Sequence, residues 1–276
     1  MLILLPPSEG KSAPKRGKPL ALADLAFPDL TEPRGRMLIA LTRLCAGDPK
    51  LATRTLGLGP TQADDVRRNA RLLETPTARA DAIYTGVLYE SLGLRSLDSA
   101  ARRRASSSLA VTSSLFGLVR PADRIPPYRL AGGINLPGLG VVSAHWRKVL
   151  DPVVGTAAGN GLVVDLRSNT YAAFWRPGRD LAARVATVRV LQQVGSRRVV
   201  VSHFNKATKG RLVRALLASG ATPRTPAALA DVVRDLGWKV ELGNPGRHGQ
   251  QLDVLVDDLQ ETAEHPPSRR SRSGAR

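Results

Sequence analysis

The sequence predicts a mixed α/β fold, in which strands and amphipathic helices follow one another along the chain. Apolar runs at residues 2–5, 109–112 and 161–168 have the length of strands, and the segments between them carry apolar residues at helical spacing. Apolar residues make up 42% of the 276 residues, enough for a sizeable core. We expect one domain over residues 1–258, followed by a basic, disordered tail over 259–276 that is rich in Pro, Ser and Arg.

The individual elements follow from local patterns. Residues 2–5 predict a buried strand because four apolar residues end at Pro6-Pro7, and the Pro-, Lys- and Gly-rich stretch that follows should cross the surface. Helical spacing predicts helices within 33–48, 48–76 (two helices), 96–105, 144–155, 205–220 and 225–237. Apolar or alternating runs predict further strands at 183–194, 197–204, 238–242 and 250–257. Segment 78–94 fits either a helix or a short strand. Thr225 is placed to cap the helix at 225–237, and Ser168 and Asn169 are placed to cap a short helix that follows them.

Charge is the strongest global signal. Lys and Arg number 41 against 23 acids, a net charge of +18, and the four arginines of the tail supply only 4 of these charges. A polyanion is the natural partner, because neutralising phosphates releases counterions. The alternative is a GC-rich genome that favours Arg codons and spreads the charge evenly.

The cysteine count and the length of the apolar runs indicate the cellular compartment of the protein. The one cysteine, Cys45, excludes an internal disulfide and a Cys-rich metal cluster, and its apolar helical face predicts a buried thiol. No apolar run approaches the roughly 20 residues that cross a bilayer. We therefore expect a cytoplasmic protein without a membrane partner. Four scattered histidines fit no metal-ligand spacing, so no metal and no cofactor are expected.

Four apolar runs end in clusters of polar residues, "LLPPSEGK", "VTSSLFGLVRPADRIPPYRL", "VVDLRSNTY" and "VVVSHFNKATKGR". Ends of strands in α/β sheets are where sites assemble, so we expect these clusters to form one site. The alternative for each is a solvated turn. Lys11 can contact a phosphate only as a point charge, because "EGK" lacks the earlier glycine of a phosphate-binding loop.

The loop "RPADRIPPYRL" carries Arg120, Asp123, Arg124, Tyr128 and Arg129 among prolines that stiffen it. Such a loop suits phosphate contacts by its arginines and stacking of a base on its tyrosine. Arg–Asp pairing that merely ties the loop down is an equal alternative.

The segment that begins at Asn205 places Lys206, Lys209 and Arg211 at the expected start of a helix. Cations there oppose the helix dipole, which suggests that a bound anion offsets the unfavourable placement. A surface helix with a basic first turn is the alternative.

Residues 48–75 have the pattern of a helix-hairpin-helix element, with Gly57 and Gly59 in the hairpin. In such elements the glycines let backbone N–H groups approach a DNA phosphate. An ordinary helical hairpin is equally compatible.

The motifs "LPPSEGK", "AIYTGVLYESL", "SSLFGLVRPADRIPPYRL", "VVDLRSNTYAAFW" and "SHFNKATKGRLVRAL" resemble those of the YaaA family of peroxide stress proteins, in its actinobacterial-type branch. The resemblance extends from Met1 to about Asp257. It implies a cytosolic, DNA-binding protein that limits damage from peroxide and free iron. The implied fold is an unusual α/β fold with a helix-hairpin-helix element, here at Leu56–Thr61, and a positively charged cleft. The "PPSEGK" motif differs between branches, and no catalytic mechanism follows from the resemblance.

The sequence therefore predicts a protein that binds duplex or damaged DNA under oxidative stress, through a cleft lined by the basic residues named above. The alternative is an enzyme acting on a nucleic acid base or nucleotide, with Glu9, Asp123 and Asp165 as acid–base or electrostatic groups. Direct iron sequestration is a third hypothesis, for which ligand clusters are lacking.

Overall fold

The computed structural model describes residues 1–194, 197–199 and 202–257, so the predicted tail at 259–276 lies outside them. Its centre is a mixed eight-stranded sheet in the order β11-β12-β9-β8-β1-β3-β4, with β10 paired to β9. The strands are β1 (Leu2–Leu5), β3 (Leu109–Ser113), β4 (Gly117–Val119), β8 (Val163–Asp165), β9 (Val185–Val194), β10 (Arg197–Val199), β11 (Lys239–Gly246) and β12 (Gly249–Asp257). The predicted mixed α/β class is confirmed.

The five strands at the middle of the sheet run parallel. Leu4 of β1 pairs with Ala110 of β3 on one side and with Asp165 of β8 on the other, while β8 pairs with β9 and β9 with β12, all parallel. Strands β4, β10 and β11 are antiparallel to their neighbours. The carboxyl ends of β1, β3 and β8 therefore meet at one edge, here called the carboxyl edge.

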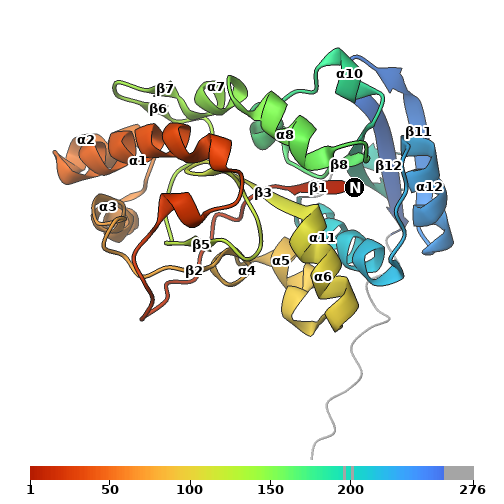
Figure 1. Cartoon of the computed structure of the whole chain (residues 1–276), viewed down its shortest axis with the longest axis horizontal. Coiled ribbons are helices and arrows are strands. Elements are labelled where there is room, and N and C mark those ends of the chain that lie inside the picture. Colours follow the sequence, from red (N-terminus) through yellow and green to blue (C-terminus); the bar gives the residue numbers. More distant parts are fainter. Residues whose placement is uncertain (195–196, 200–201, 258–276) are drawn as a thin grey trace, which may run out of the picture.

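Helices cover both faces of the sheet. Figure 1 shows α7 and α8 on one side of β1 and β8, and α5, α6 and α11 on the other. The helices are α1 (Thr31–Ala46), α2 (Pro49–Thr55), α3 (Ala63–Ala70), α4 (Ala80–Ile83), α5 (Val87–Leu92), α6 (Ser99–Ser108), α7 (Val142–Arg147), α8 (Leu150–Ala158), α9 (Asn169–Ala172), α10 (Arg179–Ala182), α11 (Ser202–Ser219) and α12 (Pro226–Asp235). One core cluster draws buried residues from Leu2 to Val254. None of the described helices is long and apolar enough to cross a bilayer.

Two short two-stranded sheets lie outside the main one. They are formed by β2 (Ala78–Arg79) with β5 (Arg124–Ile125), and by β6 (Asn135–Leu136) with β7 (Gly140–Val141). In Figure 1 these sheets lie with α1, α2 and α3 on the side of the molecule toward which β1 points. The carboxyl edge is therefore covered by chain that comes from several distant segments.

Helix caps follow the predictions in part. The Thr225 side chain accepts the N–H of Ala228 at 3.1 Å, so the predicted cap of α12 is confirmed. Ser168 occupies the N-cap position of α9, but its side chain makes no capping hydrogen bond, so that part of the prediction is wrong. Cys45 is buried, as its apolar helical face predicts.

Helix α11 begins earlier than predicted and packs tightly on α5. A Cβ atom at Gly210 would lie 2.3 Å from the backbone oxygen of Leu88, so only glycine allows the two helices to approach this closely. This contact fixes the rotation of α11 about its own axis. The rotation in turn decides which of its basic side chains point inward.

Candidate functional site

The loop after β1, residues 6–11, is held against the segment that joins α4 to α5. The Ser8 hydroxyl donates to the backbone oxygen of Gly10 at 2.6 Å and accepts the N–H of Thr85 at 3.1 Å. The Tyr89 hydroxyl donates to the backbone oxygen of Pro6 at 2.7 Å. The loop that follows the first strand is thus fixed at the carboxyl edge, although the Glu9 side chain stays exposed.

A chain of buried hydroxyl groups lies beneath this loop. The Tyr128 hydroxyl is 2.8 Å from that of Ser113 at the end of β3 and 3.1 Å from that of Tyr84. Burial raises the pKa of both phenols, which keeps them neutral at pH 7. The Tyr128 residue is only 2% exposed, so its ring offers no free face. The predicted stacking of a base on Tyr128 does not fit this arrangement.

Lys11 lies over the tyrosine pair. Its Nζ donates to the backbone oxygens of Ser8 at 2.8 Å and Glu9 at 3.4 Å, and is 4.3 Å from the centroid of the Tyr128 ring. Burial, followed by repulsion from the Arg129 guanidinium, lowers the pKa of Lys11 to about 7. The residue is nonetheless partly exposed.

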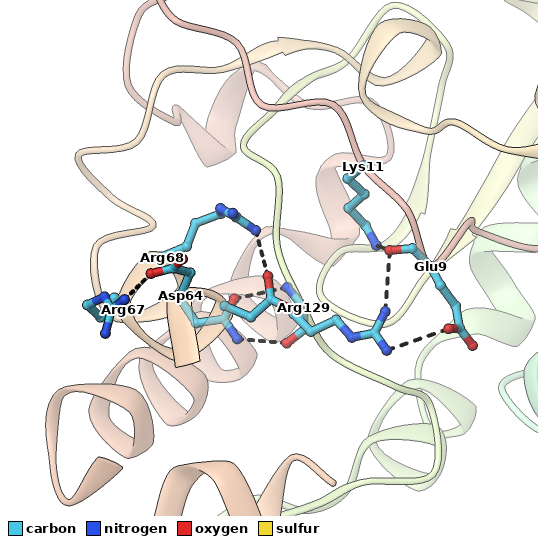
Figure 2. A network of polar contacts seen from close by, with 8 residues as sticks. Glu9, Lys11, Asp64, Arg67, Arg68 and Arg129 are labelled. Atoms are coloured by element: carbon cyan, nitrogen blue, oxygen red, sulfur yellow. Dashed lines mark hydrogen bonds and ion pairs between the residues drawn. The ribbon is translucent and has the colours of Figure 1, made fainter. Parts of the chain in front are cut away.

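Arg129 joins the first loop to helix α3, as Figure 2 shows. Its guanidinium is 3.5 Å from the Glu9 carboxylate, whose side chain is 87% exposed. Its backbone is held by Asn69 of α3, whose amide donates to the Arg129 oxygen at 2.7 Å and accepts the Arg129 N–H at 3.0 Å. Asn69 is fully buried. Segments that lie far apart in the sequence therefore meet at the carboxyl edge through two side chains.

Helix α3 carries acids as well as arginines. Asp64 pairs with Arg67, and Asp65 pairs with Arg68 at 2.7 Å, each pair separated by three residues along the helix. The two acids occupy the first turn of α3, where they compete with any phosphate for the N–H groups of the helix start.

The predicted hairpin glycines differ from each other. Gly57 has a φ of +63°, which favours glycine, whereas Gly59 has an ordinary φ of −78° and precedes a short 3₁₀ turn at Pro60–Gln62. Two helices joined by a short loop are present at this place. The arrangement by itself does not identify a DNA-binding hairpin.

Asp165, at the end of β8, is a structural anion. Its carboxylate accepts two hydrogen bonds from the Arg167 guanidinium, at 2.8 and 2.7 Å, and the two side chains are 8% and 2% exposed. Burial alone would raise the pKa of Asp165, but the pairing with Arg167 outweighs it and holds the pKa below its usual value. A carboxylate engaged in this way has no free side for catalysis.

Asp123 is engaged by backbone groups. Its carboxylate accepts the N–H groups of Ala26 at 3.0 Å and Arg120 at 2.9 Å, and the residue is 8% exposed. The Arg120 guanidinium donates to the backbone oxygen of Leu109 at 2.8 Å and lies over the Phe27 ring. Both residues tie down the loop, as the alternative interpretation expects, but through contacts with backbone rather than through direct pairing of their side chains.

Arg124 points elsewhere. Its guanidinium donates to the backbone oxygen of Thr77 at 2.9 Å and lines a pocket of about 520 Å³ with Arg79, Arg95 and Arg102. Neither Lys11 nor Arg129 lines that pocket. The structure therefore separates Arg124 from the residues with which the sequence grouped it.

The basic residues of α11 point in different directions. Lys209 is 8% exposed, and its Nζ donates to the Leu166 backbone oxygen at 2.9 Å, next to the end of β8. Burial lowers its pKa to about 8. Lys206 and Arg211 are exposed. Because a helix turns about 100° per residue, Arg211 leaves α11 roughly 140° away from Lys206.

The helix-dipole argument for an anion at α11 loses its basis. The helix begins at Ser202, so Lys206 and Lys209 lie beyond the first turn, where the dipole no longer acts strongly. Nearby, the side-chain oxygen of Asn205 is buried and has no hydrogen-bond partner among the described residues.

Sequence reasoning missed Asn69, Tyr84 and Ser113, which position Arg129 and Lys11. Asn69 could have been found, because it shares the buried face of α3 with Val66, three residues earlier. Within the described residues, no group of three or more His, Cys, Asp or Glu side chains is placed to hold a metal.

Comparison with known proteins gives a consistent result. Residues 1–242 match the family described as "Peroxide stress protein YaaA". A UPF0246 protein of Streptomyces coelicolor is 53% identical over 261 residues, covering 94% of this chain and 100% of the relative. A UPF0246 protein of Corynebacterium efficiens is 41% identical, covering 93% and 100%. An uncharacterised protein of Campylobacter jejuni is 29% identical, covering 61% and 64%.

Proposed function

Because the chain belongs to the family of the peroxide stress protein YaaA, we propose that it binds DNA during oxidative stress. By doing so it protects DNA or assists its repair, and limits the damage that iron-driven oxidation causes. The net charge of +18 supports a polyanionic partner. The proposed partner is duplex DNA or DNA with a distorted or damaged site.

The proposed DNA-binding surface is smaller than the cleft that the sequence predicts. It consists of Lys11, Arg68, Arg129 and Lys206, here called the carboxyl-edge surface. The observation that carries the proposal is the meeting of Lys11, in the loop after β1, with Arg129, in the segment after β5. We include Lys206 because it is exposed and lies about one helical turn before Lys209, whose Nζ donates to the backbone oxygen of Leu166, immediately after β8.

Several residues predicted for the cleft are left out of this surface. Arg120 and Lys209 are half-buried or buried and donate to backbone oxygens, Tyr128 is buried, and Arg124 lines the separate pocket. Asn205, whose side-chain oxygen is buried, and Arg211, which leaves α11 roughly 140° away from Lys206, are left out as well. We keep the loop at Gly57 and Gly59 as a proposed second place where backbone groups contact DNA.

Replacing Arg129 and Lys206 together with alanine should weaken duplex binding and flatten its dependence on salt. Each lost phosphate contact removes about 0.9 from the slope of log K against log salt, so the slope should fall by about 1.8. The measurement is fluorescence anisotropy of a labelled duplex titrated with protein at several salt concentrations.

The matched control removes the same charge elsewhere. Arg103 and Arg224 are exposed and have no side-chain hydrogen bond or ion pair within the described part of the chain. The Arg103→Ala/Arg224→Ala variant should keep the slope of the native protein. Equal slopes for the two double variants would exclude the carboxyl-edge surface as the place of binding.

Glu9→Gln should strengthen DNA binding. The Glu9 carboxylate is exposed and close to the Arg129 guanidinium, so it repels phosphate and competes for this cation. Exposed ion pairs contribute about 0.2–1 kcal/mol, which predicts a gain in affinity of about 1.4- to fivefold. Weaker binding by this variant would show that Glu9 contacts the ligand favourably.

The alternative function, an enzyme with Glu9, Asp123 and Asp165 as acid–base groups, loses support from the contacts described above. Asp123 and Asp165 are both buried and fully engaged, and Glu9 alone of the three is exposed. If the protein has a catalytic group at the carboxyl edge, the contacts there favour a different residue.

A further inference from the structure

The amine of Lys11 is arranged as a neutral amine would require. A neutral amine has two N–H bonds and one lone pair, and two backbone oxygens, those of Ser8 and Glu9, accept hydrogen bonds from this nitrogen. The lone pair is then unshared. No carboxylate forms an ion pair with Lys11 among the described residues, since the Glu9 carboxylate pairs with Arg129 instead.

The surroundings of Lys11 decide its charge. Burial and the cations Arg129 and Arg68 disfavour protonation of Lys11. The acids Glu9 and Asp65 favour protonation, but burial outweighs their effect. The two phenols that face the amine are neutral at pH 7 because burial raises their pKa. With a pKa of about 7, roughly half of Lys11 is unprotonated at neutral pH, against about one part in 10³ for an ordinary lysine.

We propose that Lys11 is a nucleophile that forms an imine with an aldehyde in DNA, such as the ring-opened sugar of an abasic site. A partly exposed lysine whose amine is held by two backbone oxygens, beside a cation that can hold a phosphate, is the geometry that this reaction needs. Intact DNA has no aldehyde, whereas base loss exposes one at C1′. The proposal rests on the DNA binding proposed above and assigns a substrate class to the same surface.

The step is a condensation. The Lys11 nitrogen attacks C1′ and forms a C–N bond, and the carbonyl oxygen leaves as water with the two amine protons. No oxidant or reductant is consumed. Arg129, whose side chain is 29% exposed, is placed to hold a phosphate beside the reacting sugar.

Borohydride trapping tests the proposal. The full chain is mixed with a duplex that contains one abasic site, the imine is reduced with sodium borohydride, and the covalent complex is measured on a denaturing gel. The native protein should form a complex whose peptide map places the bond at Lys11. Its yield should rise with pH through about 7 and then level off, because only the neutral amine reacts.

Two variants and one control make the test specific. Lys11→Arg keeps the positive charge and should bind the duplex but lose the covalent complex. Lys11→Met, which removes the charge as well as the amine, should also lose it. Lys148→Met, a change at an exposed lysine, should react as the native protein does. A complex that persists in both Lys11 variants, or a bond mapped to another lysine, would overturn the proposal.

The failure of this proposal can be told apart from the failure of DNA binding. Anisotropy with the same abasic duplex measures binding without chemistry. Binding without trapping would overturn the nucleophile and leave the proposed function intact. Absence of binding would count against the proposed function, and the amine is then tested by reductive methylation with formaldehyde and cyanoborohydride at pH 7. Lys11 should be modified before the other lysines, and a slower reaction would contradict its assignment.

Discussion

Asp165→Ala is expected to lower the free energy of unfolding by about 3–5 kcal/mol. The substitution leaves the Arg167 guanidinium, 2% exposed, without its carboxylate partner. A buried charge that loses its partner keeps the full desolvation cost, so the effect exceeds that of an ordinary hydrogen bond. Urea unfolding at neutral pH measures it.

The chain contains a close control for this prediction. Arg189 and Asp253 form the same two-bond pair, at 2.9 and 2.7 Å, but the arginine is 47% exposed. Exposed pairs contribute about 0–1 kcal/mol, so Asp253→Ala should be far milder. Equal losses for the two variants would show that burial does not govern the strength of the Asp165 pair.

The same pair predicts a dependence on pH. In the folded protein the pKa of Asp165 lies below its usual value. The Asp165 carboxylate therefore makes its full contribution to stability at a pH above the unfolded pKa of about 4. This contribution should be lost as the pH falls through the folded pKa. The stability difference between the native protein and Asp165→Asn should therefore shrink only in acid.

Asn69→Ala is expected to lower the free energy of unfolding by about 2–6 kcal/mol and to weaken DNA binding as well. The substitution removes the partners of both backbone groups of Arg129, and each unpaired buried group costs about 1–3 kcal/mol. The Arg129 segment should then lose its fixed position at the carboxyl edge. Urea unfolding and anisotropy on the same preparation measure the two effects.

Two comparisons separate these effects. Arg129→Ala keeps the backbone bonds to Asn69 and should weaken DNA binding while stability changes little. Asn169→Ala, a change at an exposed asparagine of α9, should stay within about 0.5 kcal/mol of the native protein. If Asn69→Ala leaves DNA binding unchanged, the link between α3 and the carboxyl-edge surface is wrong.

The order of the strands in the sheet could be predicted in part from the sequence. The apolar runs at 2–5, 109–112 and 161–168 become β1, β3 and β8, which are direct neighbours and parallel. Polar residues after each run therefore lie at one edge, as a sheet of parallel strands requires. Short apolar runs predict strands correctly here because each of these three strands is buried on both faces.

The direction of the side chains could not be anticipated. Lys209 and Lys206 look alike in the sequence, but the packing of Gly210 on α5 turns one inward and leaves the other exposed. Tyr128 is buried by contacts with Ser113 and Tyr84, which lie in other parts of the chain. Such choices depend on tertiary packing, which a pattern along one element does not contain.

Hydrogen exchange with and without duplex DNA tests most directly whether the carboxyl edge is the DNA-binding surface. We expect DNA to protect the backbone amides of residues 8–12, 63–71 and 128–131, which come together there. Protection confined to the pocket lined by Arg95 and Arg102, with none at these three segments, would contradict the account.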